Sequence, residues 1–124
     1  INTADNTATM KEYEGTVKDY GTIQIAGSFN DWADTPMLPY NTEGVENHAW
    51  YYVMEVPAGE TVQFKFKIND GSTWGTSWGY GAEDGAINMY GKCGTGGNSN
   101  LGLAEGKYVI SFNDITGAFS IVKL

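Results

Sequence analysis

Residues 62–73 read Val62-Gln63-Phe64-Lys65-Phe66-Lys67-Ile68-Asn69-Asp70-Gly71-Ser72-Thr73. Apolar and polar side chains alternate over the first part of this stretch, and a period of two places the two kinds on opposite faces of a β-strand. Asn69-Asp70-Gly71 then supplies turn chemistry, because Asp-Gly tolerates the positive φ that tight hairpins require. The pattern predicts a strand over residues 61–69, with Lys65 and Lys67 on its outer, solvated face.

Further strands are predicted by the same alternation between turn signals, over residues 22–27, 49–56, 106–112 and 118–123. Pro57-Ala58-Gly59-Glu60 has proline in its favoured early turn position, so we expect residues 49–56 and 61–69 to pair antiparallel with each other. No stretch has a helical period. Several short strands separated by turns predict an all-β fold, an antiparallel immunoglobulin-like β-sandwich of about seven to eight strands.

The inward positions of these strands define a predicted core. Its expected members are Val62, Phe64, Phe66, Ile68, Tyr108, Ile110, Phe112, Phe119 and Ile121, with Trp50 also inside. Between the strands, residues 33–48 are polar and irregular, and we expect Pro36 and Pro39 to block regular pairing there. Residues 75–100 are glycine-rich and lack periodicity, which is typical of a functional loop in a small domain.

The chain has 124 residues, the size of one domain, with residues 1–19 a linker or a first strand and residues 20–124 the sandwich. Fifteen acidic residues against seven basic ones give a formal charge of −8, which disfavours nucleic acid and anionic membranes and favours a neutral ligand.

The single Cys93 is expected to be a buried free thiol. No apolar run approaches the roughly 20 residues of a membrane span. Because the chain begins at Ile1 and shows no signal peptide, we expect a processed product or an excised module.

Aromatic residues make up 14% of the chain, so we expect some rings to face water. Three motifs then follow in order: Gly27-Ser28-Phe29-Asn30-Asp31-Trp32, Glu55-Val56-Pro57-Ala58-Gly59-Glu60, and Phe64-Lys65-Phe66 with a hairpin ending at Trp74. This order resembles the starch- and glycogen-binding modules, including the glycogen-binding domain of the AMP-activated kinase beta subunit. The later motifs are Trp74-Gly75-Thr76-Ser77-Trp78-Gly79, Gly96-Gly97-Asn98-Ser99-Asn100-Leu101 and the final Gly-Lys-Tyr…Asp-Ile-Thr-Gly hairpin. They are similar to the surface starch-binding SusE/SusF proteins of gut bacteria and to modules appended to bacterial pullulanases, and the whole resemblance covers most of residues 21–124.

The resemblance implies a non-catalytic module that binds α-glucan (starch, maltooligosaccharide, glycogen) within a larger secreted or cell-surface bacterial protein of polysaccharide degradation. We expect no cofactor, no metal and no catalytic residue. The turn tryptophan, the strand lysine and the hairpin tryptophan would contact the glucan, a second hairpin indole is a rival platform, and a late-loop asparagine would bond sugar hydroxyls. In this sequence these residues are Trp32, Lys65, Trp74, Trp78, Asn98 and Asn100.

Other classes of function remain to be weighed. A structural or protein-binding β-sandwich without carbohydrate affinity is the alternative, with the aromatic residues serving an interface. An enzyme is disfavoured, since His48 is the sole histidine and is expected at the surface, and no carboxylate pair has the setting of a glycosidase. Calcium ligation by loop carboxylates lacks a spacing signature. Those carboxylates are Asp31, Asp34, Glu83 and Asp84.

Overall fold

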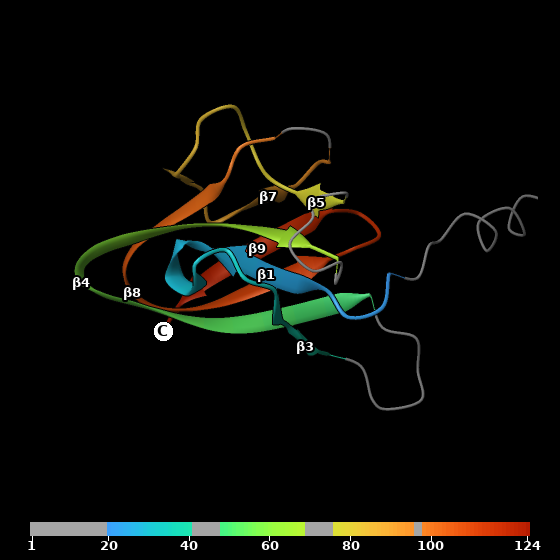
Figure 1. Cartoon of the computed structure of the whole chain (residues 1–124), viewed down its shortest axis with the longest axis horizontal. Coiled ribbons are helices and arrows are strands. Elements are labelled where there is room, and N and C mark those ends of the chain that lie inside the picture. The colour runs from blue at the N-terminus through green and yellow to red at the C-terminus, as the bar shows by residue number, and fades with distance from the viewer. Residues whose placement is uncertain (1–19, 41–47, 69–75, 96–97) are drawn as a thin grey trace, which may run out of the picture.

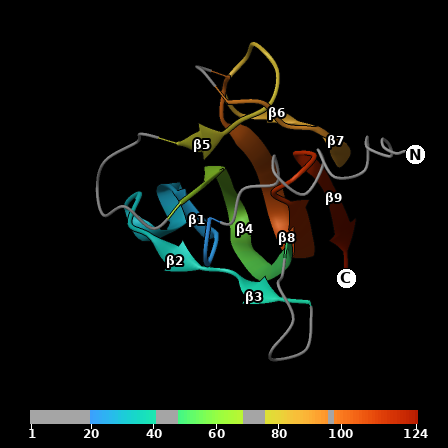
Figure 2. The same cartoon turned by 90° about the vertical axis from the view of Figure 1, so that its right-hand side faces the viewer.

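The computed structural model describes residues 20–40, 48–68, 76–95 and 98–124. Within them the fold is all-β, with one short 3-10 helix, η1 (Ser28–Asn30). The strands are β1 (Gln24–Gly27), β2 (Thr35–Pro36), β3 (Leu38–Pro39), β4 (Ala49–Lys67), β5 (Ser77–Trp78), β6 (Ala86–Ile87), β7 (Tyr90–Lys92), β8 (Leu101–Asn113) and β9 (Ala118–Lys123). They form one hydrogen-bonded sheet that is antiparallel except for the β6–β8 pair. In Figure 2 its order runs from β2 and β1 through β4 and β8 to β9.

Two long strands turn this single sheet into a sandwich. β4 has 19 residues and β8 has 13, and both curve back on themselves at the same end of the molecule (Figure 1). The first half of β4 pairs with β3 on one side and with the second half of β8 on the other. The second half of β8 pairs in turn with β9, and β9 pairs with β7. The second half of β4 pairs with the first half of β8, β1 and β5. We call these the first layer and the second layer; the predicted sandwich is confirmed.

The predicted pairing of residues 49–56 with residues 61–69 is wrong. Both segments belong to β4, and both pair with β8, with a shift in register between Val56 and Thr61. The Pro57–Glu60 segment is therefore the bend between layers and not a hairpin turn. Gly59, at φ 80°, donates its backbone N–H to Glu105 Oε1 at 2.6 Å, which ties the bend of β4 to that of β8.

The core lies between the two layers and contains the predicted inward residues. Phe66 of the second layer stacks on Phe112 of the first at a centroid distance of 4.2 Å, so the two inner faces interdigitate. Trp50 is buried, as predicted, and Cys93 is a buried thiol. The fully buried side chains include Ile23, Ile25, Phe64, Phe66 and Ile110, while Ile68 is half-buried against the same cluster.

Short strands that contain proline lie at the edges of the sheet. Pro36 and Pro39 do not prevent pairing, because β2 and β3 are edge strands of two residues in which the missing N–H faces away from the partner. Residues 76–95, predicted to lack regular structure, contain β5, β6 and β7. The predicted N-terminal segment 1–19 and the Asn69-Asp70-Gly71 turn lie outside the described residues. No helix among the described residues is long and apolar enough to cross a lipid bilayer.

Candidate ligand-binding site

The turn after β1 holds Trp32 in an uncommon backbone conformation. Asp31 has φ 58° and Trp32 has φ 61°, both in the left-handed region that non-glycine residues seldom adopt. Each such residue costs on the order of 1–3 kcal/mol and persists only where its surroundings enforce it. The Trp32 side chain is half-buried, so the enforced conformation places a partly accessible indole at a defined position.

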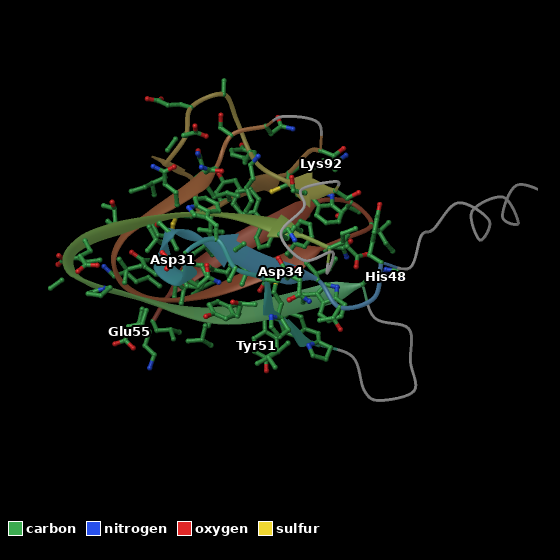
Figure 3. The ribbon with its side chains drawn as sticks, in the orientation of Figure 1. Asp31, Asp34, His48, Tyr51, Glu55 and Lys92 are labelled. Atoms are coloured by element: carbon green, nitrogen blue, oxygen red, sulfur yellow. The ribbon has the colours of Figure 1, made fainter. Side chains whose placement is uncertain are left out.

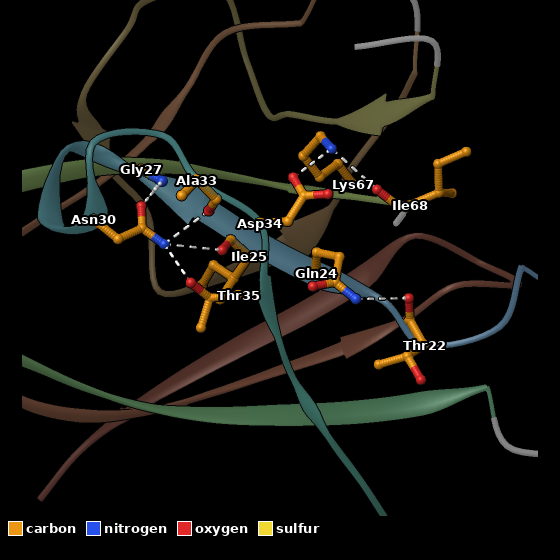
Figure 4. A network of polar contacts seen from close by, with 10 residues as sticks. All are labelled: Thr22, Gln24, Ile25, Gly27, Asn30, Ala33, Asp34, Thr35, Lys67 and Ile68. Carbon is orange, nitrogen blue, oxygen red and sulfur yellow. Dashed lines mark hydrogen bonds and ion pairs between the residues drawn. The ribbon is translucent and has the colours of Figure 1, made fainter. Parts of the chain in front are cut away.

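The Asn30 side chain enforces this conformation (Figure 4). Its Oδ1 accepts the Gly27 backbone N–H at 2.9 Å, and its Nδ2 donates to Ala33 O at 2.9 Å and to Thr35 Oγ1 at 2.6 Å. The Trp32 N–H donates across the same turn to Gly27 O at 2.8 Å. Asparagine suits this role because its short amide supplies both donors and an acceptor to nearby backbone.

Lys65 lies beside this turn on β4. The register places Lys65 opposite Ala26 of β1, and the next residue, Gly27, accepts the Trp32 N–H. The turn that carries Trp32 thus starts one residue after Ala26, the cross-strand neighbour of Lys65. The Lys65 side chain is half-buried, and its ammonium has no hydrogen-bond or ion-pair partner among the described residues. It remains available to a ligand.

The expectation that Lys67 lies on a solvated face is wrong. Its side chain is fully buried, and Nζ lies 2.6 Å from Asp34 Oδ1 and 3.1 Å from Ile68 O (Figure 4). The segment after Trp32 runs back across β1 as β2, which brings the Asp34 carboxylate over the end of β4. Asp34 Oδ2 is buried and accepts no hydrogen bond from the residues that the structure describes. Lys67 is therefore a buried ion-pair partner that fastens the Trp32 turn.

Asn100 is brought to the Lys65 face through Gln63. Asn100 Nδ2 donates to Gln63 Oε1 at 3.0 Å, and Gln63 stands two residues before Lys65 on the same face of β4, about 7 Å away. The Asn100 backbone N–H donates to Asp84 Oδ1 at 2.8 Å, which fixes the loop. Within the described residues, Asn100 Oδ1 accepts no hydrogen bond, so the carbonyl oxygen remains available as an acceptor.

Asn98 belongs to a different part of the loop. Its Nδ2 donates to Thr95 O at 3.1 Å, and its backbone carbonyl oxygen lies so close to Gly79 that a Cβ there would meet it at 2.8 Å. Asn98 therefore packs against residues 79–95. Of the two predicted asparagines, Asn100 is the one linked to the Lys65 face.

The sequence suggested that Trp78 is an exposed platform, but its side chain is buried. On β5, Trp78 pairs with Phe66 of β4, and it is 5% exposed. Its ring lies edge-on to Tyr20 and to Phe112, at a centroid distance of 5.2 Å from each. The Gly/Ser/Thr-rich surroundings in sequence gave no sign that the layer's edge closes over this indole. Trp74 lies outside the described residues, so its place at the site stays a prediction.

His48 is also not a surface residue. Its Nδ1 lies 2.6 Å from Asp114 Oδ1, whose carboxylate also accepts the Trp50 Nε1–H at 3.0 Å. The Asp114 backbone N–H donates to His48 O at 2.9 Å. This buried cluster joins the start of β4 to the turn after β8, and its groups are occupied with one another.

The loop carboxylates considered for calcium do not gather. Asp34 pairs with Lys67, and Asp84 accepts the Asn100 N–H. Among the described residues, no three His, Cys, Asp or Glu side chains come together in a way that would hold a metal ion.

Sequence reasoning missed the residues that support the site. Asn30 holds the turn of Trp32 through hydrogen bonds, and Asp34 pairs with Lys67. Gln63 accepts a hydrogen bond from Asn100. A signal existed only for Asn30, since asparagine within a Gly-Ser-Phe-Asn-Asp-Trp turn is a residue type that bonds local backbone.

Comparison with known proteins supports the fold. No protein-family model and no curated protein match the chain. Among solved structures, SusF from Bacteroides thetaiotaomicron superposes with a TM-score of 0.63 and 19% sequence identity over 83% of this chain. The match covers 24% of SusF, so the chain spans about a quarter of that protein's length. At this identity the similarity shows a SusF-like fold.

Proposed function

We propose that this chain is a non-catalytic α-glucan-binding module that binds starch and maltooligosaccharides through Trp32, Lys65 and Asn100, together with Trp74. The observation that carries the proposal is the Trp32 turn, in which Asn30 holds the backbone of the half-buried Trp32 in a left-handed conformation, directly after the strand β1 that pairs with Lys65. Backbone strain of this kind clusters at sites where a side chain must be positioned for a ligand.

The chemistry of the three side chains suits a neutral sugar. The face of a pyranose ring presents C–H groups, which pack on the electron-rich face of an indole; by analogy with aromatic pairs, each contact contributes roughly 0.5–1.5 kcal/mol beyond area burial. The Lys65 ammonium donates hydrogen bonds and Asn100 Oδ1 accepts them, so both kinds of sugar hydroxyl contact are provided. A neutral ligand also tolerates the net charge of −8.

Pre-organisation adds to the affinity. An indole that already stands in its binding orientation loses little conformational freedom when a sugar binds. The hydrogen bonds of Asn30 and the buried Lys67–Asp34 ion pair supply this rigidity on both sides of Trp32.

The setting of the module follows from the resemblance. The motifs similar to surface starch-binding SusE/SusF proteins and the SusF-like fold support the same reading. Since the matched region is 24% of SusF, we place the module within a larger, multi-domain bacterial protein that is secreted or at the cell surface. Its role there is to hold α-glucan and not to cleave it.

Isothermal titration with maltoheptaose and electrophoresis through starch-containing gels test the proposal. We expect a dissociation constant between micromolar and millimolar, and Trp32→Ala should weaken it roughly tenfold to a hundredfold, by analogy with base–aromatic stacking. Ile115→Ala is the matched control, because Ile115 is 53% exposed in the turn after β8, away from the site. Unretarded migration of the parent protein in starch gels, or release of reducing sugar from starch by a purified sample, would contradict it.

A further inference from the structure

The outer face of the first layer carries a row of side chains that the proposed site does not use. Cross-strand register aligns Tyr51 of β4 with Ser111 of β8, Ser111 with Ser120 of β9, and Ser120 with Tyr90 of β7. Residues directly opposite each other in antiparallel strands share a face, so these four side chains point outward together. In Figure 3, Tyr51 lies on the outer side of the first half of β4. We call this row the tyrosine–serine strip.

A second tyrosine fixes one end of the strip. The Tyr40 ring lies against Tyr51 at a centroid distance of 4.8 Å and a tilt of 41°, and its hydroxyl is 2.9 Å from Ser111 Oγ. The Tyr40 backbone N–H donates to Ala49 O at 3.0 Å, which extends the edge pairing of β3. Tyr40 is nevertheless 54% exposed. The ring is therefore held in place over the sheet while much of its surface stays open to solvent.

The strip has the dimensions of a short oligosaccharide site. Tyr51 and Tyr90 are separated by three strand spacings, about 14 Å at roughly 4.8 Å each. Tyr90, at the far end, is 77% exposed. Two serine hydroxyls lie between the aromatic ends, so groups that donate and accept hydrogen bonds stand between two stacking surfaces.

Few charges border the strip: in the two rows beside it the charged residue is Lys92 of β7, two residues after Tyr90. The other row is aliphatic, formed by Val53, Val109 and Val122. Neither this aliphatic row nor the strip contains a charged residue, although the chain carries 15 acidic side chains and a net charge of −8. An uncharged band on an acidic protein is complementary to an uncharged polymer and offers nothing to a basic partner.

We propose that the tyrosine–serine strip is a second binding site, which takes an α-glucan chain laid across the strands of the first layer. The identity of the glycan rests on the proposed function, whereas the site itself is separate from Trp32. Lys65 and the Trp32 turn belong to the second layer, so the two sites lie on different layers of the sandwich and bind independently. A polymer that engages both would be retained more strongly than a short oligosaccharide.

Titration of the full, isotope-labelled chain with maltoheptaose, followed residue by residue in NMR spectra, tests this inference. We expect saturable shifts of the Ser111, Ser120 and Tyr90 amides in addition to those of Lys65. Tyr90→Ala should weaken the strip's affinity about tenfold without moving that of the Lys65 site. Ile87→Ala, on β6 and 55% exposed, is the matched control and should leave both unchanged.

The outcomes separate the two proposals. Shifts confined to Lys65 and its neighbours would overturn the strip and leave the proposed function in place. Shifts confined to the strip would support this inference and overturn the Trp32 site. Without shifts at either place, both fail. Strip shifts that grow with protein concentration in the absence of sugar would identify a self-association surface and overturn the inference as well.

Discussion

Lys67 Nζ lies 2.6 Å from Asp34 Oδ1, and this buried ion pair binds the segment after Trp32 to the end of β4. Removing one partner of a buried pair leaves the other charge uncompensated, which costs about 3–5 kcal/mol. We therefore expect Asp34→Ala to lower the free energy of unfolding by about 3 kcal/mol in urea titrations. The double variant Asp34→Ala/Lys67→Met should recover part of that loss, because it removes the stranded ammonium. Equal stability of Asp34→Ala and the parent would show that the pair is not needed.

Asn30 should affect both stability and glucan binding. Asn30→Ala leaves the Gly27 N–H and the Ala33 carbonyl without their partner, at about 1–3 kcal/mol each where these groups stay buried. Loss of the turn also releases Trp32, so we expect maltoheptaose affinity to fall about as far as in Trp32→Ala, measured by titration at a temperature where the variant is folded.

Asn113→Ala is the matched control for Asn30. Asn113 Oδ1 accepts the N–H groups of Ile115 and Thr116 in the turn after β8, so its loss also removes two turn hydrogen bonds. It should lower stability while leaving the Trp32 site intact. Equal binding losses in the two variants would mean that the effect of Asn30 is general destabilisation and not positioning of the indole.

Lys65→Ala should weaken glucan binding less than Trp32→Ala does. An exposed ammonium exchanges a hydrogen bond to water for one to a sugar hydroxyl, a net contribution of about 0.5–1.5 kcal/mol, or a little more for a charged donor. Titration with maltoheptaose gives the ranking directly. A larger loss for Lys65→Ala than for Trp32→Ala would place the main contact on the lysine.

Trp78→Ala should destabilise the fold by about 3–5 kcal/mol through the cavity that it leaves beside Phe112. Trp78→Phe keeps part of that packing, and we expect it to bind starch like the parent protein. Gel retardation of Trp78→Phe checks this. Loss of retardation in a stably folded Trp78→Phe would return the indole to the binding site.

Burial raises the pKa of the Cys93 thiol to about 12, from an ordinary value near 9. At pH 8 only about one thiol in ten thousand is then ionised, and the thiolate is the reactive form. We expect a disulfide reagent to modify Cys93 slowly in the native protein and rapidly in urea. The raised pKa also means that this thiol's contribution to stability is lost as the pH rises from about 9 towards 12. Fast native-state modification at pH 8 would contradict its burial.

The local pattern of side chains was enough to predict much of the fold. Alternation in residues 61–68 placed Phe64 and Phe66 in the core, where both are fully buried, and the same rule held for β9. This works because the faces of a strand depend only on the order of residues along it. The polar Asn30 turn and the exposed positions next to it follow from similarly local chemistry.

Pairing and environment are not local properties. A turn-like Pro57–Glu60 fits a hairpin as well as a bend, and only the presence of β8 alongside both halves of β4 distinguishes the two. Lys65 and Lys67 are equivalent in an alternating strand, yet one is half-buried with an ammonium open to a ligand and the other is fully buried. The difference arises because Asp34, 33 positions earlier in the chain, is carried over Lys67 alone.

Sequence therefore determined the segments of the longer strands, their inward faces and the residue types of the proposed glucan site, since each depends on neighbours a few positions apart. The tertiary structure decided which of those residues remain accessible. It buried Trp78 beneath the edge of the second layer, linked Asn100 rather than Asn98 to the Lys65 face, and aligned Tyr51 with Tyr90 across the first layer. The physical reason is that solvent exposure and cross-strand alignment depend on contacts between segments far apart in the chain, which no local period encodes.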